Sequence, residues 1–179
     1  VEDVVLARSS QRRLDPSRSL SANLLRTAYA AATRGIDVPH RVVVNAVDGF
    51  EPGVYRWPEL ARPGTFRDEL YFVALDQGLP RDAAFVVTGV TDVSRLDDRE
   101  YREAQLAAGL VEGRLHLIAY ALGAGASGMT FLDSEVPGLL GEQVDTLLFT
   151  CVGVPEYESK RGGGPGAPAE FRQVTPRAG

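Results

Sequence analysis

The chain has 179 residues, 44% hydrophobic and 24% charged, so it is long enough for one domain with a substantial core. Its net charge of -5 argues against nucleic acid as the main partner, because proteins that bind nucleic acids carry net basic surfaces. No apolar stretch reaches membrane-spanning length, no signal peptide is visible, and the single Cys151 excludes an internal disulfide, which together predict a cytoplasmic protein without a membrane partner.

A basic cluster follows the first predicted element, a short helical turn at residues 1–7. Arg8, Arg12 and Arg13 stand within six residues of one another, and Ser10 lies among them. Arginine suits a bound phosphate, because its planar guanidinium stays charged and donates paired hydrogen bonds. In a chain of net negative charge this local cluster predicts a small anionic ligand. The alternative is a solvated basic patch.

The next predicted elements are a helix, two strands and a second helix. The first helix begins after Ser21, a residue type that favours the N-cap, and ends at Gly35, a residue type that favours helix C-termini. A β-branched stretch at 41–47 predicts a strand, which returns through an Asp-Gly turn into a strand at 53–57. A helix is expected over 66–76.

The second half of the chain contains the strongest core signals. Residues 83–90 are expected to form a buried strand, and residues 98–122 a long helix with an apolar face. The apolar positions of that helix are Tyr101, Leu106, Leu110, Val111, Leu115, Ile118, Ala119 and Leu122. An extended segment (126–131), a short helix (134–140) capped by Asp133 and a last strand (145–154) follow. Because strands and helices do not alternate evenly, the sequence predicts the α+β class.

Glycine and proline dominate the tail after Pro155. This change of composition divides the chain into a domain at residues 1–155 and a C-terminal extension at residues 156–179. We expect the extension to wrap a partner subunit.

Several stretches, in the right order along the chain, resemble the FMN-dependent nitroreductase family. The run Arg8-Ser9-Ser10-Gln11-Arg12-Arg13-Leu14 is similar to the Arg-Arg-Ser-x-Arg-Lys-Phe opening of that family. The stretch 101–123 is similar to its long central helix, and the segments that fit the same pattern are 53–57, 125–131, 133–141 and 149–155. The resemblance is nearest to the SagB-type dehydrogenase branch. It implies a nitroreductase-like fold, with a central, mostly antiparallel sheet flanked by helices, in a homodimer or beside a second homologous domain.

The resemblance also implies a binding site for FMN. Arg8 and Ser10 would bind the phosphate, and Arg12 would lie near N1 and the C2 carbonyl, where a cation stabilises the reduced ring. Gly128 and Met129 would direct backbone amides toward N5. For Arg12 the alternative is a surface ion pair, worth about 0–1 kcal/mol.

A second basic pair follows the last predicted strand. Lys160, with Arg161 as the second choice, precedes a Gly-Gly-Pro-Gly run, where the SagB-like branch has a basic residue that returns to the phosphate. The alternative is a merely soluble tail. His40 and His116 are assigned no chemistry, no catalytic residue is identified, and no metal-ligand spacing is present.

The sequence departs from the family at two places. The family has an asparagine at the flavin edge after its first helix, where this chain has Ile36 or Asp37. Members that oxidise azolines carry a Lys-Tyr pair before the long helix, and residues 94–98 contain none. Azoline oxidation is therefore not assigned.

Three functions remain open at this point. The first is an FMN-dependent oxidoreductase that passes hydride through flavin N5 to a small-molecule or peptide substrate, with NAD(P)H as a possible electron donor. The second is a degenerate relative that binds flavin without turnover or serves as a structural partner. The third is an anion-binding α+β domain unrelated to flavin.

Overall fold

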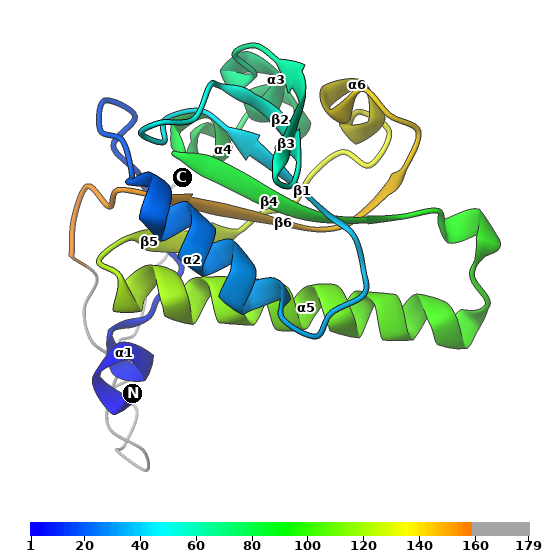
Figure 1. Cartoon of the computed structure of the whole chain (residues 1–179), viewed down its shortest axis with the longest axis horizontal. Coiled ribbons are helices and arrows are strands. Elements are labelled where there is room, and N and C mark those ends of the chain that lie inside the picture. Colours follow the sequence, from blue (N-terminus) through cyan, green and yellow to red (C-terminus); the bar gives the residue numbers. More distant parts are fainter. Residues whose placement is uncertain (159–179) are drawn as a thin grey trace, which may run out of the picture.

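A computed structural model of the chain describes residues 1–158. Its helices are α1 (Glu2–Ala7), α2 (Ala22–Thr33), α3 (Arg67–Val73), α4 (Gly78–Asp82), α5 (Asp98–Ala121) and α6 (Val136–Leu140). Its strands are β1 (His40–Val44), β2 (Gly53–Arg56), β3 (Glu59–Pro63), β4 (Phe85–Thr91), β5 (Gly125–Gly128) and β6 (Asp145–Gly153). Figure 1 shows the strands as one sheet with helices on both of its faces.

The sheet has the strand order β3-β2-β1-β4-β6-β5, and every neighbouring pair is antiparallel. The prediction of an α+β fold with a mostly antiparallel central sheet is therefore confirmed. The inner strands β4 and β6 are almost entirely buried, as expected for β-branched segments covered on both faces. β5 forms one edge of the sheet.

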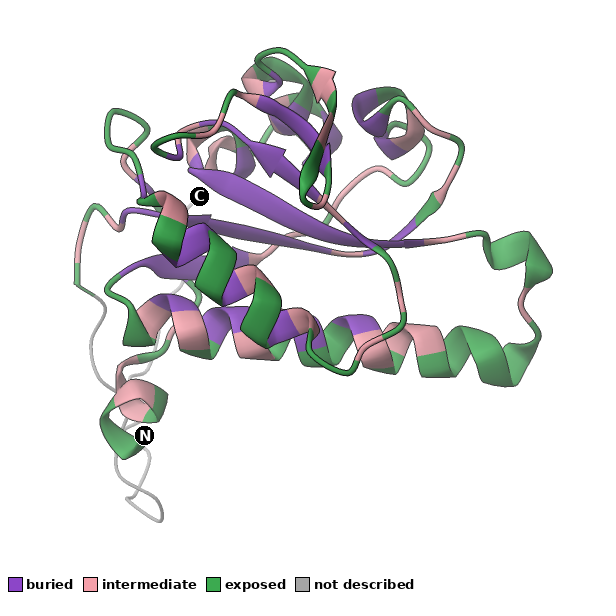
Figure 2. Ribbon diagram, in the orientation of Figure 1, coloured by how far each residue is buried: buried purple, intermediate pink, exposed green. Residues whose placement is uncertain are grey.

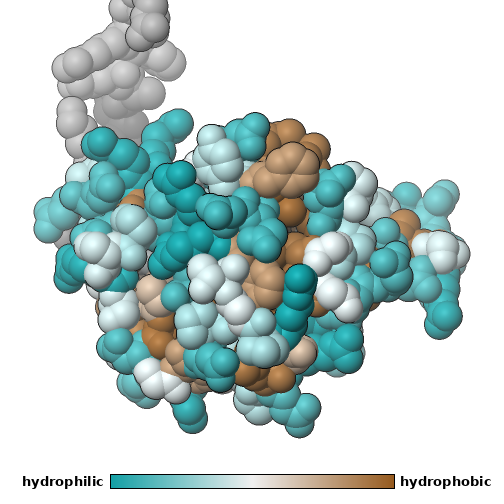
Figure 3. All heavy atoms as spheres, turned by 90° about the horizontal axis from the view of Figure 1, so that it is seen from above, coloured by the Kyte–Doolittle hydropathy of each residue, from teal (hydrophilic) through white to brown (hydrophobic). Residues whose placement is uncertain are grey.

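The core is divided by the sheet into two halves. On one face α2 and α5 pack through residues such as Leu25, Val111 and Leu115. On the other face α3 and α6 pack through residues such as Leu70 and Leu139. Figure 2 shows the buried strands between these two helical layers. The outer surface of the α3, α4 and α6 layer, seen in Figure 3, mixes hydrophilic side chains with small hydrophobic patches.

Helix starts were predicted correctly where a capping side chain is present. Ser21 accepts a hydrogen bond from the amide of Leu24 and begins α2, as expected. Asp97 and Glu100 form a reciprocal capping box at the start of α5. The prediction that Asp133 caps the next helix is wrong: Glu135 occupies the N-cap of α6 and makes no side-chain capping hydrogen bond.

The long helix α5 has a buried inner face and an apolar outer stripe. Val111, Leu115 and Ala119 face the sheet, as predicted. Leu106 is 67% exposed and Leu110 is 46% exposed, so the predicted apolar face of this helix is only partly buried. Leu106, Leu110, Gly113 and Leu117 follow one another at spacings of four, three and four residues, and we refer to them as the outer stripe.

The N-terminal arm, residues 8–14, runs along the exposed edge of β5. The amide of Gln11 donates to the carbonyl of Ala126 at 3.0 Å, and Leu14 forms a bridge with Pro155. The basic cluster is thereby fixed against the edge of the sheet. Within residues 1–158, no helix combines the length and the apolar composition needed to cross a membrane.

Candidate functional site

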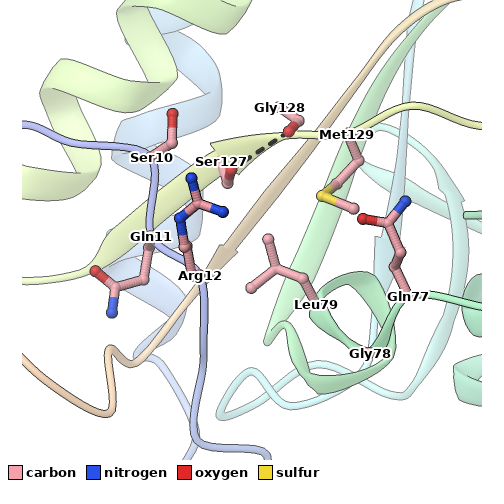
Figure 4. Close-up of a pocket in the computed structure, with 9 residues that line it drawn as sticks. All are labelled: Ser10, Gln11, Arg12, Gln77, Gly78, Leu79, Ser127, Gly128 and Met129. Atoms are coloured by element: carbon pink, nitrogen blue, oxygen red, sulfur yellow. Dashed lines mark hydrogen bonds between the residues drawn. The ribbon is translucent and has the colours of Figure 1, made fainter. Parts of the chain in front are cut away.

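A pocket of about 450 Å³ lies where the arm passes the end of β5, and we refer to it as the arm pocket. Three chain segments line it: the arm, the start of α4 and the end of β5. The lining residues are Ser10, Gln11, Arg12, Gln77, Gly78, Leu79, Ser127, Gly128 and Met129 (Figure 4). Four of the seven residues predicted for the cofactor site, namely Ser10, Arg12, Gly128 and Met129, are therefore brought together.

Arg12 provides the positive charge of the arm pocket. Its backbone amide donates to the hydroxyl of Tyr157 at 3.3 Å, which fixes the position of the residue. Its guanidinium makes no ion pair with any residue in the range 1–158. The alternative interpretation of Arg12, a surface ion pair, is therefore not found among these residues. Arg13, the next residue, does pair with Glu156 at 3.3 Å and is 71% exposed.

Gly128 and Met129 contribute to the pocket in different ways. In an antiparallel strand, alternate residues direct their N–H and C=O groups to the same side. The carbonyl of Ala126 points outward to the arm, so the amide of Gly128, two residues later, also points outward from the sheet edge. The amide of Met129 donates to the carbonyl of Phe149 at 2.8 Å, so Met129 presents its side chain instead.

Gln11 lies between Ser10 and Arg12 and holds the arm in place. Its side chain is 1% exposed, and its amide nitrogen donates to the carbonyls of Arg13 (3.1 Å) and Tyr157 (3.3 Å). Its side-chain oxygen accepts from the hydroxyl of Tyr120 at 3.3 Å. A buried amide with several hydrogen bonds orients a segment strongly, because each lost bond would leave a desolvated polar atom.

Gln77 was not anticipated from the sequence. It enters the pocket directly after Leu75 and Asp76, two non-glycine residues in left-handed backbone conformation with φ values of 60° and 57°. Such residues are uncommon and concentrate at functional sites. No pattern in the sequence marks this turn.

Arg8 lies in a different hollow, a groove of about 390 Å³ along α5. The groove is lined mainly by apolar or small residues of that helix, and its members are Arg8, Gly109, Leu110, Gly113, Arg114, His116 and Leu117. We refer to it as the α5 groove. Arg8 makes no hydrogen bond or ion pair through its side chain within residues 1–158. Lys160 and Arg161 lie outside the described residues.

Both histidines are buried away from the arm pocket. Burial lowers the pKa of His40, and it lowers the pKa of His116 with a further contribution from the Arg8 charge. Both imidazoles are therefore neutral at neutral pH. Arg41, next to His40 in the chain, is bound bidentately by Glu142, and this contact lowers the pKa of the Glu142 carboxyl.

Solved structures of nitroreductase-type proteins share this fold. One from Anabaena variabilis aligns with a TM-score of 0.76 and 27% identity, over 83% of this chain and 37% of its own length. One from Exiguobacterium sibiricum, solved in complex with FMN, aligns with a TM-score of 0.66 and 13% identity, over 95% of this chain and 96% of its own. An NAD(P)H:FMN oxidoreductase-type protein from Staphylococcus epidermidis aligns with a TM-score of 0.67 and 11% identity, over 96% and 91%.

The chain therefore has a nitroreductase-like fold, as the sequence resemblance implied. It spans little more than a third of the length of the Anabaena protein. No family model matches the sequence, and no curated protein matches it either.

Proposed function

We propose that this chain is an FMN-dependent oxidoreductase of the nitroreductase type, nearest to the SagB-type dehydrogenases. The observation that carries the proposal is the arm pocket, in which the unpaired cation of Arg12 meets neutral hydrogen-bonding groups on a nitroreductase-like fold. Bound FMN would supply hydride transfer at N5, with electrons from NAD(P)H or directly from the substrate.

The residues of the arm pocket fit the flavin end of FMN. The volume of about 450 Å³ lies within the range of cofactor pockets, about 300–1,000 Å³. Arg12 would hold the pyrimidine edge, where a cation stabilises the negative charge of the reduced ring. The side-chain amide of Gln77 offers both a donor and an acceptor to the same edge. The outward amide of Gly128 is the group that would face N5.

The phosphate would extend along the arm, beyond Ser10. The hydroxyl of Ser10 lines the pocket, and Arg8 stands two residues further toward the N-terminus. Because the Arg8 guanidinium is bound to no other described residue, its side chain is free to turn from the α5 groove to a phosphate. Lys160, with Arg161 second, would complete the anion site, as the resemblance implies.

We also propose a homodimer, which the outer stripe of α5 supports. Gly113 is exposed, and an added Cβ there would meet no atom within 4 Å, although glycine costs a helix about 1 kcal/mol. Packing within one chain therefore does not explain this glycine. A two-fold axis midway between residues 111 and 112 would place Leu110 in the notch of Gly113 of the second copy, and Leu106 against Leu117. The stripe is thus complementary to itself in antiparallel packing, and the extension at 156–179 would wrap the second copy.

One observation favours a second candidate, flavin binding without turnover. Among residues 1–158, the arm pocket is lined by no acid or base that titrates near neutral pH, and Arg12 is its only ionisable member in that range. A flavin protein without turnover has no need of such a group, so its absence favours this second candidate. The absence does not exclude the first candidate, because reactions carried by the flavin itself do not require such a group. The absent family asparagine at Ile36 or Asp37 also favours the second candidate.

A spectroscopic experiment separates these candidates. The full chain is purified, reconstituted with FMN, examined for a flavin absorption spectrum, and then treated anaerobically with NADH or NADPH. Bleaching of the yellow colour is the expected result. A stable yellow complex that neither NADH nor NADPH reduces, and that passes no electrons to an added acceptor after reduction by dithionite, would support flavin binding without turnover. A colourless protein that does not retain FMN would overturn both.

A further inference from the structure

A carboxylate lies directly behind the arm pocket, on the opposite side of β5. A Cβ added at Gly128 would collide with Oε1 of Glu112 on α5, so the two residues are in close contact. The other side of Gly128 lines the pocket. Only the thickness of one glycine backbone separates the Glu112 carboxylate from whatever occupies that space.

The Glu112 charge is weakly satisfied where it lies. Among residues 1–158, its one hydrogen bond comes from the hydroxyl of Thr150 at 3.3 Å, and no cation pairs with it. It lines a void between α5 and the sheet that is too small for a water molecule. Burial raises the pKa of this carboxyl.

The groups that face Glu112 from the neighbouring strands do not neutralise it. From β1, His40 lines the same void, but its Nδ1 is hydrogen-bonded to the Val38 carbonyl at 2.7 Å and burial lowers its pKa, so the ring is neutral. From β6, Thr150 donates its hydroxyl, and the thiol of Cys151 is kept protonated by a raised pKa. The segments of β4 and β5 that face Glu112 contribute only apolar or glycine residues.

We propose that Glu112 is a positioning residue for electron transfer, which acts across Gly128 and opposes Arg12 in setting how readily a flavin in the arm pocket accepts electrons. The inference rests on the proposed function. A negative charge behind the ring disfavours the negative charge that reduction adds, while Arg12 on the open side favours it. Gly128 is required on this account because any side chain would displace the carboxylate.

The test compares the affinities for reduced and oxidised FMN, obtained from the midpoint potential of the reconstituted protein. Glu112→Gln removes the charge and keeps the shape and an acceptor for Thr150. At about pH 8 we expect the variant to favour reduced FMN about tenfold more than the wild type does, which is ~30 mV for a two-electron couple. The difference should close as the pH falls below the pKa of the wild-type carboxyl, which burial raises.

Two further variants serve as controls for the role of the Glu112 charge. Glu103→Gln removes an exposed carboxylate of the same helix, paired with Arg99, and should leave the potential unchanged. Thr150→Val removes the hydrogen bond that stabilises the ionised carboxylate, and this loss raises the pKa of Glu112. The potential of the bound flavin should therefore respond to the protonation of Glu112 at a higher pH in Thr150→Val than in the wild type. This second variant tests the charge of Glu112 even if Glu112→Gln folds poorly.

The outcomes are distinguishable. Equal potentials for Glu112→Gln and wild type at every pH would overturn this inference and leave FMN binding intact. A difference that does not depend on pH would also overturn it, because a merely structural effect does not titrate. Failure of the wild type to bind FMN would overturn the proposed function and this inference with it.

Discussion

The arm pocket and the α5 groove lie along the same short arm but differ in what they offer a ligand. The pocket, with Arg12, is built from three chain segments and presents neutral donors and acceptors beside one cation. The groove, with Arg8, is formed mainly by one helix and is predominantly apolar. The first has the composition of a cofactor site and the second that of a protein contact. Two arginines four residues apart can therefore serve different surfaces.

The largest expected effect is the weakening of the proposed dimer when a side chain fills the α5 groove. Gly113→Leu would place a side chain in the notch that we expect to receive Leu110 of the second copy, at both symmetry-related positions. The dimer should weaken about 100-fold or more, since the burial of a leucine is worth about 1.5–3 kcal/mol at each position. Sedimentation velocity over a concentration series measures this. The monomer should remain folded, because nothing within the chain opposes a side chain there.

A change on another helix controls for surface hydrophobicity. Thr27→Leu adds an apolar side chain at an exposed position of α2, away from the outer stripe, and should leave the dimer constant within a few-fold. If Gly113→Leu sediments as wild type does, the outer stripe is not the contact between copies.

The next effect decides to which hollow Arg8 belongs. We expect Arg8→Ala combined with Lys160→Ala to weaken FMN binding about 100-fold, because two charge-assisted hydrogen bonds to phosphate are lost. Riboflavin, which has no phosphate, should bind the variant and the wild type equally. Fluorescence titration with both ligands measures the difference. An unchanged FMN affinity, accompanied by a weaker dimer, would instead place Arg8 in the groove.

The pocket itself is tested by two adjacent residues. Arg12→Ala should weaken FMN binding about tenfold and should weaken riboflavin binding equally, because Arg12 is proposed to hold the ring end. Arg13→Ala removes an equal charge that is already paired with Glu156 at the surface, so its effect should stay within about twofold. Equal losses for the two variants would mean that Arg12 acts only through general electrostatic attraction.

The smallest expected effect is on the pKa of His116, which lines the α5 groove. The pKa of His116 is lowered by burial and by the charge of Arg8, so Arg8→Gln should raise it toward the ordinary value of 6.5. The pKa of His116 is lower in the folded than in the unfolded state, so the neutral imidazole stabilises the folded state above about pH 6.5, and this stabilisation is lost as the pH falls. Because the pKa shift is smaller in Arg8→Gln, the variant should lose less folding free energy on acidification. NMR titration of the two histidines measures the shift. His40, whose pKa reflects burial and Arg41, should not move.

Long, strongly patterned elements could be predicted from the sequence, and short ones could not. The helices α2 and α5 and the strands β4 and β6 were found because local capping and periodicity agree with their packing. β3 was missed because it is a half-exposed edge strand bounded by prolines, and α4 because it contains glycine and proline within five residues. Such elements depend on tertiary contacts that no local pattern encodes.

The site was predicted where one continuous motif carries it. Ser10 and Arg12 lie together as expected, because the arm is extended and fixed by Gln11. The separation of Arg8 depends on where the short helix α1 ends against α5, a tertiary contact. The entry of Gln77 depends on a strained turn that ordinary propensities disfavour. The exposure of Leu110 was missed because a helical apolar pattern cannot distinguish a core from a contact between copies.

The arm also has a consequence for solubility. A sheet edge with unpaired backbone groups is a template for association with other chains, and proteins protect such edges by covering them. Here the cover over β5 is the same segment that carries Ser10 and Arg12, attached through Gln11 to Ala126. A chain whose arm detaches would therefore lose its binding site and expose an aggregation-prone edge in the same event. Ligands that tighten the arm should accordingly protect the protein from precipitation as well as from unfolding.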